Sequence, residues 1–568
     1  MLRCLRIAAG LLLILPSMVN AAERIGDFSL LDDRGYFHQM GWYSDQKAIA
    51  LLVQAIGSST DSSAIPGFIE LQQRYQPQGI TFFMINPMGR KDRDDVAAAM
   101  QQLGIAIPVL MDDAQLVSES LGVRVTGELI IYDPRSFSIL FRGPVGVEAA
   151  NALDAILESR PVTVAEVSVS GDPVEFQAKL QHDRFTPSYE RDIARIISQN
   201  CAKCHREDGI APFALDSHTM VQGWSPMIRE VVMTKRMPPG QVDPHIGNFT
   251  NDMVLNDEDS QTLLHWIAAG APNDSTEDPL HKLTWPETQW AFGEPDYIIK
   301  IPPQEIPATG VLDYYNVTVA VDIDKDRWVR ASQYIPGDRS VLHHTLHSII
   351  PPGATRGGSL LGGDDPDRPN IAPYIPGQDP RLEPPNTGGL LKAGTRIAMQ
   401  MHYTTNGKAT VDESQIGVWF YPEDYIPQER MVGNCACIFT PTWVNIPAHN
   451  PDYEMQTSFT IEKDAQLFSL TPHMHFRGKR MRFYADYPDG SREELLNIAR
   501  YNYNWQLAYT FAQPKPVPAG TVITAVGAFD NSSRNPANPD PARSVPWGLQ
   551  SWDEMFFGAA DWKYVSLE

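Results

Sequence analysis

Residues 470–480 read LTPHMHFRGKR, which places His473 and His475 two positions apart. The stretch is predicted to be a strand, because apolar and polar residues alternate up to and through it. In a strand, residues i and i+2 point to the same side, so both imidazoles can approach one metal ion. The spacing also fits two histidines on a solvated sheet face. The remaining ligands of a metal site must therefore come from elsewhere in the chain.

Short segments with the same alternation occur throughout the C-terminal half, for example at 315–322 and 396–403. Proline and glycine separate these segments, which is typical of antiparallel strands in β-sandwiches. The sequence therefore predicts two all-β, jelly-roll-like sandwich domains, one over residues 285–425 and one over residues 426–568.

The N-terminal part, residues 24–160, instead alternates predicted strands and helices and ends in a predicted hairpin and helix. It resembles the thioredoxin fold of the redoxin family. The loop after the first central strand, residues 55–63, contains no cysteine, and Gly127 stands where that family has a cis-proline. We therefore expect a redox-dead docking or structural domain, followed by a linker over residues 161–186.

The length and the net charge of the chain limit the possible classes of protein. The chain has 568 residues, too many for one core, and a formal net charge of -23. An acidic surface disfavours nucleic acid as a partner, because the phosphates would be repelled. Residues 1–21 have the basic start, short apolar run and small-residue end of a signal peptide. We expect a secreted, periplasmic protein without a transmembrane segment.

The pentapeptide CAKCH at residues 201–205 matches the attachment motif for a c-type haem. Cys201 and Cys204 would bond to the two vinyl groups of the porphyrin, and His205 would ligate the iron. Residues 187–275 around the motif are predicted to be mainly helical and resemble a small, all-α cytochrome c domain. The sequence therefore predicts one covalently bound haem c. A disulfide beside an unrelated histidine is the alternative.

A sixth ligand to the haem iron is expected downstream of the motif. Met237 is the first choice, because the two prolines that follow it stiffen its loop. A methionine ligand raises the reduction potential and suits electron transfer. Met233, Met227 and His245 are alternatives, and Met237 could also be a residue of the core.

Further histidines precede the opening pair in the chain. His343 and His344 are adjacent, His347 follows them, and His402 precedes a tyrosine. Each histidine alone is weak evidence for a metal site, because an isolated histidine on a strand is more often structural. Since neighbours on a regular strand point to opposite faces, His343 and His344 can share a metal only where the strand ends or bulges. His347 is expected to be structural or to lie outside the ligand set.

Taken in order, these residues resemble the copper type II, ascorbate-dependent monooxygenases, the family of peptidylglycine alpha-hydroxylating and dopamine beta-monooxygenase. The resemblance implies two copper ions, one in each sandwich domain. It assigns the first copper to His343, His344 and His402, and the second copper to His473, His475 and Met555. Imidazole suits both oxidation states of copper, whereas the thioether of methionine favours Cu(I).

The resemblance implies hydroxylation of a C–H bond with dioxygen. The haem domain in the same chain suggests that electrons reach the copper ions through the haem, from an external donor. The substrate is expected to be a small or peptide-like molecule. A peptide C-terminus is disfavoured, because Thr471 stands where the peptidylglycine enzyme has a carboxylate-binding arginine. A periplasmic electron-transfer or copper-binding protein without enzymatic activity is the alternative.

Two smaller features complete the predictions. Cys435 and Cys437 form a disulfide, remain free thiols or bind additional copper, and an oxidising compartment favours the disulfide. Trp552, Phe556 and Phe557 surround Met555 in the sequence and belong either to an apolar substrate pocket or to the core.

Overall fold

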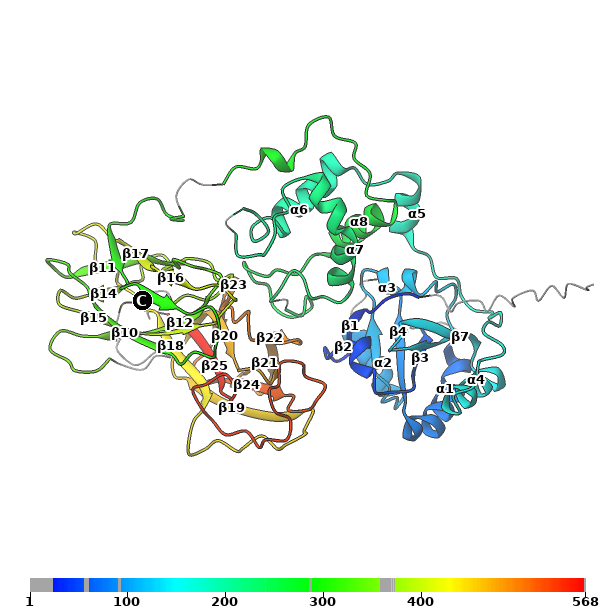
Figure 1. The fold of residues 1–568 in the computed structure, drawn as a ribbon. Helices are drawn as coiled ribbons and strands as arrows, with labels where there is room; N and C mark the ends of the chain where they lie inside the picture. The colour runs from blue at the N-terminus through cyan, green and yellow to red at the C-terminus, as the bar shows by residue number, and fades with distance from the viewer. Residues whose placement is uncertain are drawn as a thin grey trace, which may run out of the picture.

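The computed structural model describes residues 24–55, 61–89, 93–207, 209–240, 242–285, 289–357, 369, 371 and 373–565. The chain is multidomain, with an α/β part, a helical segment and two β regions that lie in this order across Figure 1 from right to left. The predicted signal peptide lies outside the described residues. Among the helices that the structure describes, none is long and apolar enough to cross a bilayer.

The N-terminal part has a seven-stranded sheet in the order β2-β1-β5-β4-β3-β6-β7. In this sheet β3 runs parallel to β4 and antiparallel to β6, and β6 forms a hairpin with β7. This is the arrangement of a thioredoxin-like fold. Its elements are β1 (Ser29–Asp32), β2 (Phe37–Gln39), β3 (Ala48–Val53), α1 (Asp61–Tyr75), β4 (Ile80–Asn86), α2 (Arg93–Gln102), β5 (Val109–Met111), α3 (Leu116–Ser120), β6 (Glu128–Asp133), β7 (Ser138–Pro144) and α4 (Val147–Leu157).

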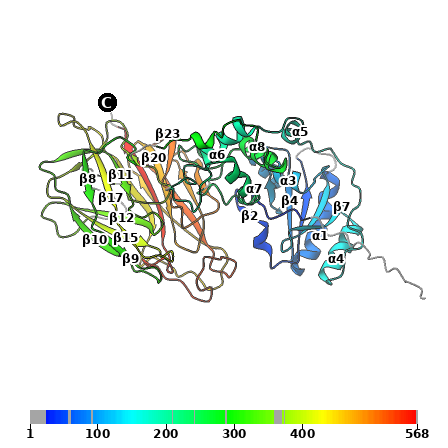
Figure 2. The ribbon, with the colours of Figure 1, turned by 45° about the horizontal axis from the view of Figure 1, so that its top comes forward.

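The two faces of this sheet are covered by different parts of the chain. Successive residues of a strand point to opposite faces, and Leu52 packs with α1, α2 and α4. Leu51 packs on the other face with α3, and with Met233 and Leu264 from the helical segment. The helical segment is therefore docked on the thioredoxin-like sheet, as Figure 2 also shows.

The helical segment consists of α5 (Gln177–Arg184), a π-helical turn η3 (Tyr189–Ile193), α6 (Ala194–Asn200), α7 (His218–Met233) and α8 (Asp257–Ala268). Ser217 and Asn256 cap α7 and α8 by accepting hydrogen bonds from backbone N–H groups of the first turn. The predicted linker, residues 161–186, has structure of its own. It contains α5, which is held against α8 by a hydrogen bond of 2.8 Å between His182 and His265.

The first β region has two larger sheets that share one core, which we call the first sheet pair, and a separate two-stranded sheet of β9 and β16. One sheet has the order β10-β15-β12, and the other has the order β13-β11-β17-β8 with β14 beside β11. The strands are β8 (Tyr297–Lys300), β9 (Gln304–Ile306), β10 (Tyr315–Ala320), β11 (Arg327–Ile335), β12 (Leu342–Ile350), β13 (Arg381–Leu382), β14 (Gly389–Leu391), β15 (Arg396–Tyr403), β16 (Thr410–Asp412) and β17 (Gln415–Phe420).

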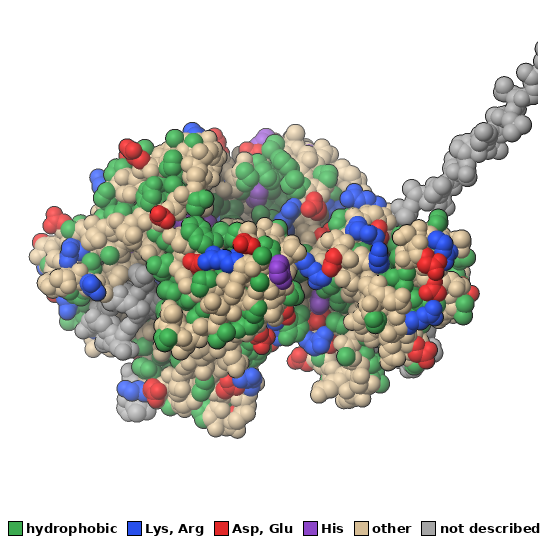
Figure 3. Space-filling view, turned by 60° about the horizontal axis from the view of Figure 1, so that its bottom comes forward, with side chains coloured by type: hydrophobic (Ala, Val, Ile, Leu, Met, Phe, Trp, Pro, Cys, Tyr) green, Lys and Arg blue, Asp and Glu red, His purple; other side chains and the backbone are tan. Residues whose placement is uncertain are grey.

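The second sheet pair has two four-stranded sheets, β18-β25-β20-β23 and β19-β24-β21-β22, around the core that contains Leu470 and Phe483. Its strands are β18 (Val432–Ile438), β19 (Tyr453–Ile461), β20 (Ala465–His473), β21 (Gly478–Asp486), β22 (Arg492–Ile498), β23 (Tyr509–Val517), β24 (Thr521–Phe529) and β25 (Phe556–Tyr564). Over the face in Figure 3, acidic and basic side chains are both spread among apolar ones.

Candidate metal centre

Three histidines gather at the ends of β12 and β15, which are neighbours in the first sheet pair. His343 and His344 lie at the start of β12, and His402 lies near the end of β15. One ligand nitrogen from each histidine lies within 4.8 Å of the ligand nitrogens of the other two. Among the described His, Cys, Asp and Glu side chains, these three form a group that could hold a metal ion. We call these residues the first cluster.

A β-bulge allows the adjacent histidines to face the same side. The register between β12 and β15 shifts between Leu342 and His344, so that His343 is left without a partner in the ladder. The Nδ1 atoms of His343 and His344 are 2.8 Å apart as a result. The bulge thus allows two consecutive residues of a strand to point toward the same side, as they must if they share one metal ion.

The imidazoles of the first cluster are held in the neutral form, which is the form that binds metals. Burial, followed by repulsion from His343, lowers the pKa of His402 to about 3. Burial also lowers the pKa of His344 well below its usual range. Each ring therefore offers a lone pair near neutral pH without first having to lose a proton.

His473 and His475 form a second cluster at the end of β20, with their ring centroids 5.2 Å apart. His473 Nδ1 is hydrogen-bonded to the side chain of Gln506, and His475 Nδ1 lies 3.3 Å from the carbonyl oxygen of Asp553. Metal-binding histidines commonly engage one ring nitrogen in this way and bind the metal through the other. The Nε2 atoms are thus the nitrogens left for a ligand.

Met555 is held beside this pair by its neighbour, Glu554. The buried Glu554 carboxyl group, whose pKa burial raises to about 8, accepts hydrogen bonds from the backbone N–H groups of His475 at 2.8 Å and Arg477 at 2.6 Å. β20 pairs with β25 as far as His473 and Phe557, and Met555 precedes Phe557 by two residues. Met555 is 7% exposed. The three residues predicted for the second copper therefore lie in one region.

The two clusters lie close enough for their charges to interact. The pKa of His344 is lowered first by burial, then by His343 and His402, and also by His473 and His475 of the second cluster. The five histidines of the two clusters thus lie close together where the two sheet pairs face each other, although the first and the last of them, His343 and His475, are far apart in the sequence.

The haem-attachment motif forms a turn directly after α6. Cys201 and Cys204 are free thiols, and no disulfide joins them. His205 Nδ1 lies 3.1 Å from the carbonyl oxygen of Phe213, which leaves Nε2 as its free nitrogen. This is the arrangement that a histidine ligand to iron needs, with one nitrogen fixed by a backbone acceptor. The residues at the motif therefore fit a c-type haem.

The candidates for the sixth ligand have different surroundings. Met233 is buried in the core against the thioredoxin-like sheet, and His245 Nε2 is bound to Asp113 at 2.7 Å. Met237 is 36% exposed and Met227 is 43% exposed. Met233 and His245 are thus already engaged, whereas the thioethers of Met237 and Met227 remain accessible to a ligand.

The motif lies against the first sheet pair. Lys203 Nζ is 3.0 Å from Asp379 Oδ1. Burial raises the pKa of Tyr374, which lies in the same segment as Asp379. The backbone N–H of Tyr374 donates to Thr345 Oγ1 at 2.8 Å, and Thr345 follows His344 in β12. Lys203 of the motif and Thr345 of β12 therefore both contact the segment that joins β12 to β13.

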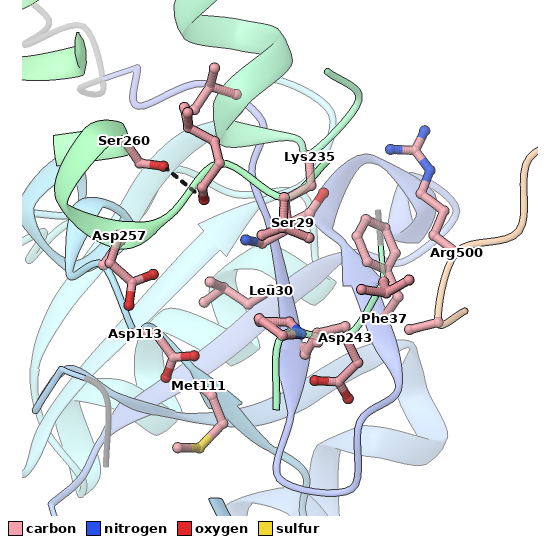
Figure 4. Close-up of a pocket in the computed structure, with 18 of the residues that line it drawn as sticks. Ser29, Leu30, Phe37, Met111, Asp113, Lys235, Asp243, Asp257, Ser260 and Arg500 are labelled. Atoms are coloured by element: carbon pink, nitrogen blue, oxygen red, sulfur yellow. Dashed lines mark hydrogen bonds between the residues drawn. The ribbon is translucent and has the colours of Figure 1, made fainter. Parts of the chain in front are cut away.

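A cavity lies where the thioredoxin-like part, the helical segment and residues 499–502 meet (Figure 4). Asp113, Asp243 and Asp257 line it together with Lys235 and Arg500. Met233 and His245, two of the alternatives for the sixth haem ligand, also line it, whereas Cys201, Cys204, His205, Met237 and the copper residues are not among its lining residues. It belongs to the interface between the parts of the chain.

The other residues named from the sequence lie outside the proposed ligand sets. Cys435 and Cys437 are joined by a disulfide in β18. His347 is buried away from the first cluster, with Nε2 at 3.0 Å from Thr345 Oγ1. Phe556 is part of the core of the second sheet pair, whereas Phe557 stacks on the ring of His473 with centroids 5.5 Å apart.

Sequence reasoning missed the loop between β22 and β23, which contacts both clusters. Tyr503, Asn504 and Gln506 of this loop lie at hydrogen-bonding distance from His402, His343 and His473, respectively. These three residues do not follow a spacing that is typical of metal ligands. Only their density of aromatic and amide side chains in the run YNYNWQ, residues 501–506, sets the loop apart.

No protein-family model and no curated protein matches the chain. Among solved structures, a hypothetical protein from Sinorhizobium meliloti 1021 is 20% identical with a TM-score of 0.23, over 28% of this chain and 92% of that one. The pneumococcal exposed lipoprotein thioredoxin from Streptococcus pneumoniae strain TIGR4 is 19% identical with a TM-score of 0.21, over 23% and 99%. A thioredoxin domain of a thiol-disulfide oxidoreductase from Bacteroides vulgatus is 15% identical with a TM-score of 0.21, over 24% and 96%. Likeness at this level assigns no function.

Proposed function

We propose that the chain is a secreted, periplasmic copper-dependent monooxygenase that hydroxylates a C–H bond with dioxygen. One observation carries the proposal. Two groups of buried or partly buried histidines face each other between two sheet pairs, and Glu554, which precedes Met555, is bound to the second group. Their order in the chain is that of the copper type II, ascorbate-dependent monooxygenases.

The donor sets fit copper. The first cluster offers three imidazoles, and the second offers two imidazoles and the thioether of Met555. Imidazole binds copper in both oxidation states, and a thioether favours Cu(I) over harder ions such as Zn²⁺. Copper bound at these residues would supply the activation of dioxygen. The role of the chain is to present neutral donors in fixed orientations and to exclude bulk water from them.

The reaction determines what else the protein needs. The substrate gains one oxygen atom in a C–H bond, the second oxygen atom leaves as water, and two electrons and two protons are consumed. We assign the delivery of the electrons to a haem c bound to Cys201 and Cys204, with His205 and Met237 as iron ligands. An external donor reduces this haem. The contact of Lys203 with Asp379 supports the assignment, because it is an exposed ion pair between the motif and a loop of the sheet pair that contains the first cluster.

The surroundings of the second cluster favour a substrate without a carboxylate. Thr471 faces Ala559 across the strands β20 and β25, in the place where the peptidylglycine enzyme has its arginine. The apolar ring of Phe557 lies on His473. A small, largely apolar molecule suits these neighbours better than a peptide C-terminus does.

Metal and haem analysis of the purified protein tests the proposal. We expect one haem and two copper ions per chain. The double variant His473→Ala, His475→Ala should retain the haem and one copper ion, and a matched variant His343→Ala, His344→Ala should lose the other. A parent protein that binds no copper would contradict the proposal.

Oxygen consumption separates this function from the alternative of an electron-transfer or copper-binding protein. The enzyme should consume dioxygen when a reductant and a substrate are both present, and Met555→Ala should abolish the consumption. A protein with full copper and haem content that consumes no dioxygen with any C–H substrate tested would instead support the alternative.

A further inference from the structure

One loop of the second sheet pair contacts the histidines of both clusters. It joins β22 to β23. Tyr503 Oη lies 3.2 Å from Nδ1 of His402, and Asn504 Oδ1 lies 3.1 Å from Nε2 of His343. Two residues later, the Gln506 side chain is bound to His473. The first cluster is therefore completed by side chains that its own sheet pair does not supply.

Tyr503 has the most extensive of these contacts. Its ring stacks on His343, with centroids 4.7 Å apart and an angle of 17° between the planes. The ring of His475 approaches it edge-on, with centroids 6.1 Å apart. A single buried side chain thus touches one histidine of each cluster.

The hydroxyl group of Tyr503 is fixed from both sides. Ser551 Oγ lies 2.6 Å from it, and His402 Nδ1 lies on its other side. A phenol hydroxyl can accept one hydrogen bond and donate another. The contact with Nδ1 fixes the orientation of the His402 ring.

We propose that Tyr503 is a positioning residue shared by the two metal sites. Its hydroxyl group fixes the tautomer and orientation of His402, and its ring fixes His343 and His475 relative to each other. The inference rests on the proposed function, because it concerns copper bound at the two clusters. It adds that the copper site of the first sheet pair depends on a residue of the second.

The physical basis is the outer-shell effect on metal ligands. Partners that orient a ligating histidine typically contribute 10- to 100-fold in metal affinity, although they do not touch the metal. Because the hydroxyl and the ring of Tyr503 contact different histidines, two substitutions separate their effects. Tyr503→Phe removes only the hydroxyl group, and Tyr503→Ala also removes the ring.

The test is a copper titration in two backgrounds that each retain one site. In the His473→Ala, His475→Ala background, Tyr503→Phe should weaken copper binding at the first cluster by about 10- to 100-fold. In the His343→Ala, His344→Ala background, Tyr503→Phe should leave binding at the second cluster unchanged, and Tyr503→Ala should weaken it. Electron paramagnetic resonance of Cu(II) at the first cluster should change in both variants.

Tyr509→Phe is the matched control. Tyr509 is also buried in the second sheet pair, but its hydroxyl group donates to the carbonyl oxygen of Gly240 at 2.8 Å and contacts neither cluster. This variant should bind copper as the parent does. Nitrogen-15 NMR of labelled histidines adds a metal-free measurement, in which Tyr503→Phe should alter the tautomer balance of His402.

The outcomes distinguish the two proposals. If the parent binds no copper at either cluster, the proposed function fails, and this inference fails with it. If the parent binds two copper ions, and Tyr503→Phe matches Tyr509→Phe in copper affinity, resonance spectrum and histidine NMR, then only the inference about Tyr503 is wrong.

Discussion

The Glu554 carboxylate accepts a hydrogen bond of 2.8 Å from the backbone N–H of His475. The carboxylate is fully buried, and its second oxygen accepts from the backbone N–H of Arg477. The segment that carries the histidine pair is therefore tied to the segment that carries Met555 by one side chain. This connection leads to the first prediction.

Glu554→Ala should destabilise the protein and remove copper from the second cluster. The substitution leaves two buried N–H groups without an acceptor, each of which costs about 1–3 kcal/mol. We expect the free energy of unfolding to fall by about 2–6 kcal/mol, measured by denaturant unfolding. Glu554→Gln keeps one acceptor oxygen, so its free energy of unfolding should lie between those of the parent and the alanine variant. Equal stability of Ala and Gln variants would argue against the role of these hydrogen bonds.

Met555→Leu should lower the affinity of the second cluster for Cu(I) while changing the stability little. Leucine has a similar volume, and such exchanges usually cost less than about 1.5 kcal/mol. The thioether that favours Cu(I) is lost. Met481→Leu is the matched control, because Met481 is buried in the core of the same sheet pair. A Cu(I) titration in which both variants bind equally would show that Met555 is only a core residue.

Met237→Leu should lower the reduction potential of the haem, because a methionine ligand raises it. The haem should stay attached, since Cys201 and Cys204 are unchanged. Met227→Leu, a substitution of the exposed methionine in α7, is the control and should leave the potential as it was. Redox titration followed by absorbance measures both. A shift in the control alone would assign the ligand to Met227 instead.

Asp112→Asn should change how stability depends on pH. Burial raises the pKa of Asp112 from 3.8 to about 6, so the folded state binds this proton more tightly than the unfolded state. The stabilising contribution is complete below pH 3.8 and is lost as the pH rises through 6. At about 1.36 kcal/mol per pKa unit, the parent should lose about 1–3 kcal/mol relative to the variant between pH 4 and 7. Parallel stability curves of the parent and the variant would contradict this.

Arg93→Met should weaken the attachment of the thioredoxin-like part to the rest of the chain. The buried Arg93 guanidinium pairs with Asp243, which also accepts from Asn497 Nδ2 at 2.9 Å. Removing one partner of a buried pair costs about 3–5 kcal/mol, because the other charge is left uncompensated. Arg74→Met removes an exposed pair with Asp154 and should cost less than about 1 kcal/mol. Unfolding by denaturant compares the two variants, and equal losses would contradict the prediction.

The parts of the fold that depend on local periodicity could be predicted from the sequence. The strand over 396–403 and the helix over 257–268 have the bounds that their apolar patterns indicate. The register shifts beside His343 and His344, which is the irregularity that the sequence requires if the two share a metal ion. Such predictions succeed because side-chain direction follows directly from the backbone period.

Contacts between parts could not be predicted in the same way. Helix α5 lies in a stretch with little apolar periodicity, and its packing depends on His265 of α8, which is 83 positions away from His182. The contact of Tyr503 with His402 spans 101 positions and two sheet pairs. Contacts of this kind depend on how whole sheets pack together, and no local pattern in the sequence encodes them.

The contact of Tyr503 and Asn504 with the first cluster limits how the protein can be divided for study. A fragment that ends after β17 would retain His343, His344 and His402 but lose both of these partners. It would expose to water a face that the second sheet pair covers in the intact chain. Such a fragment would be a poor surrogate for the first copper site, and metal affinities measured on it should not be transferred to the whole protein.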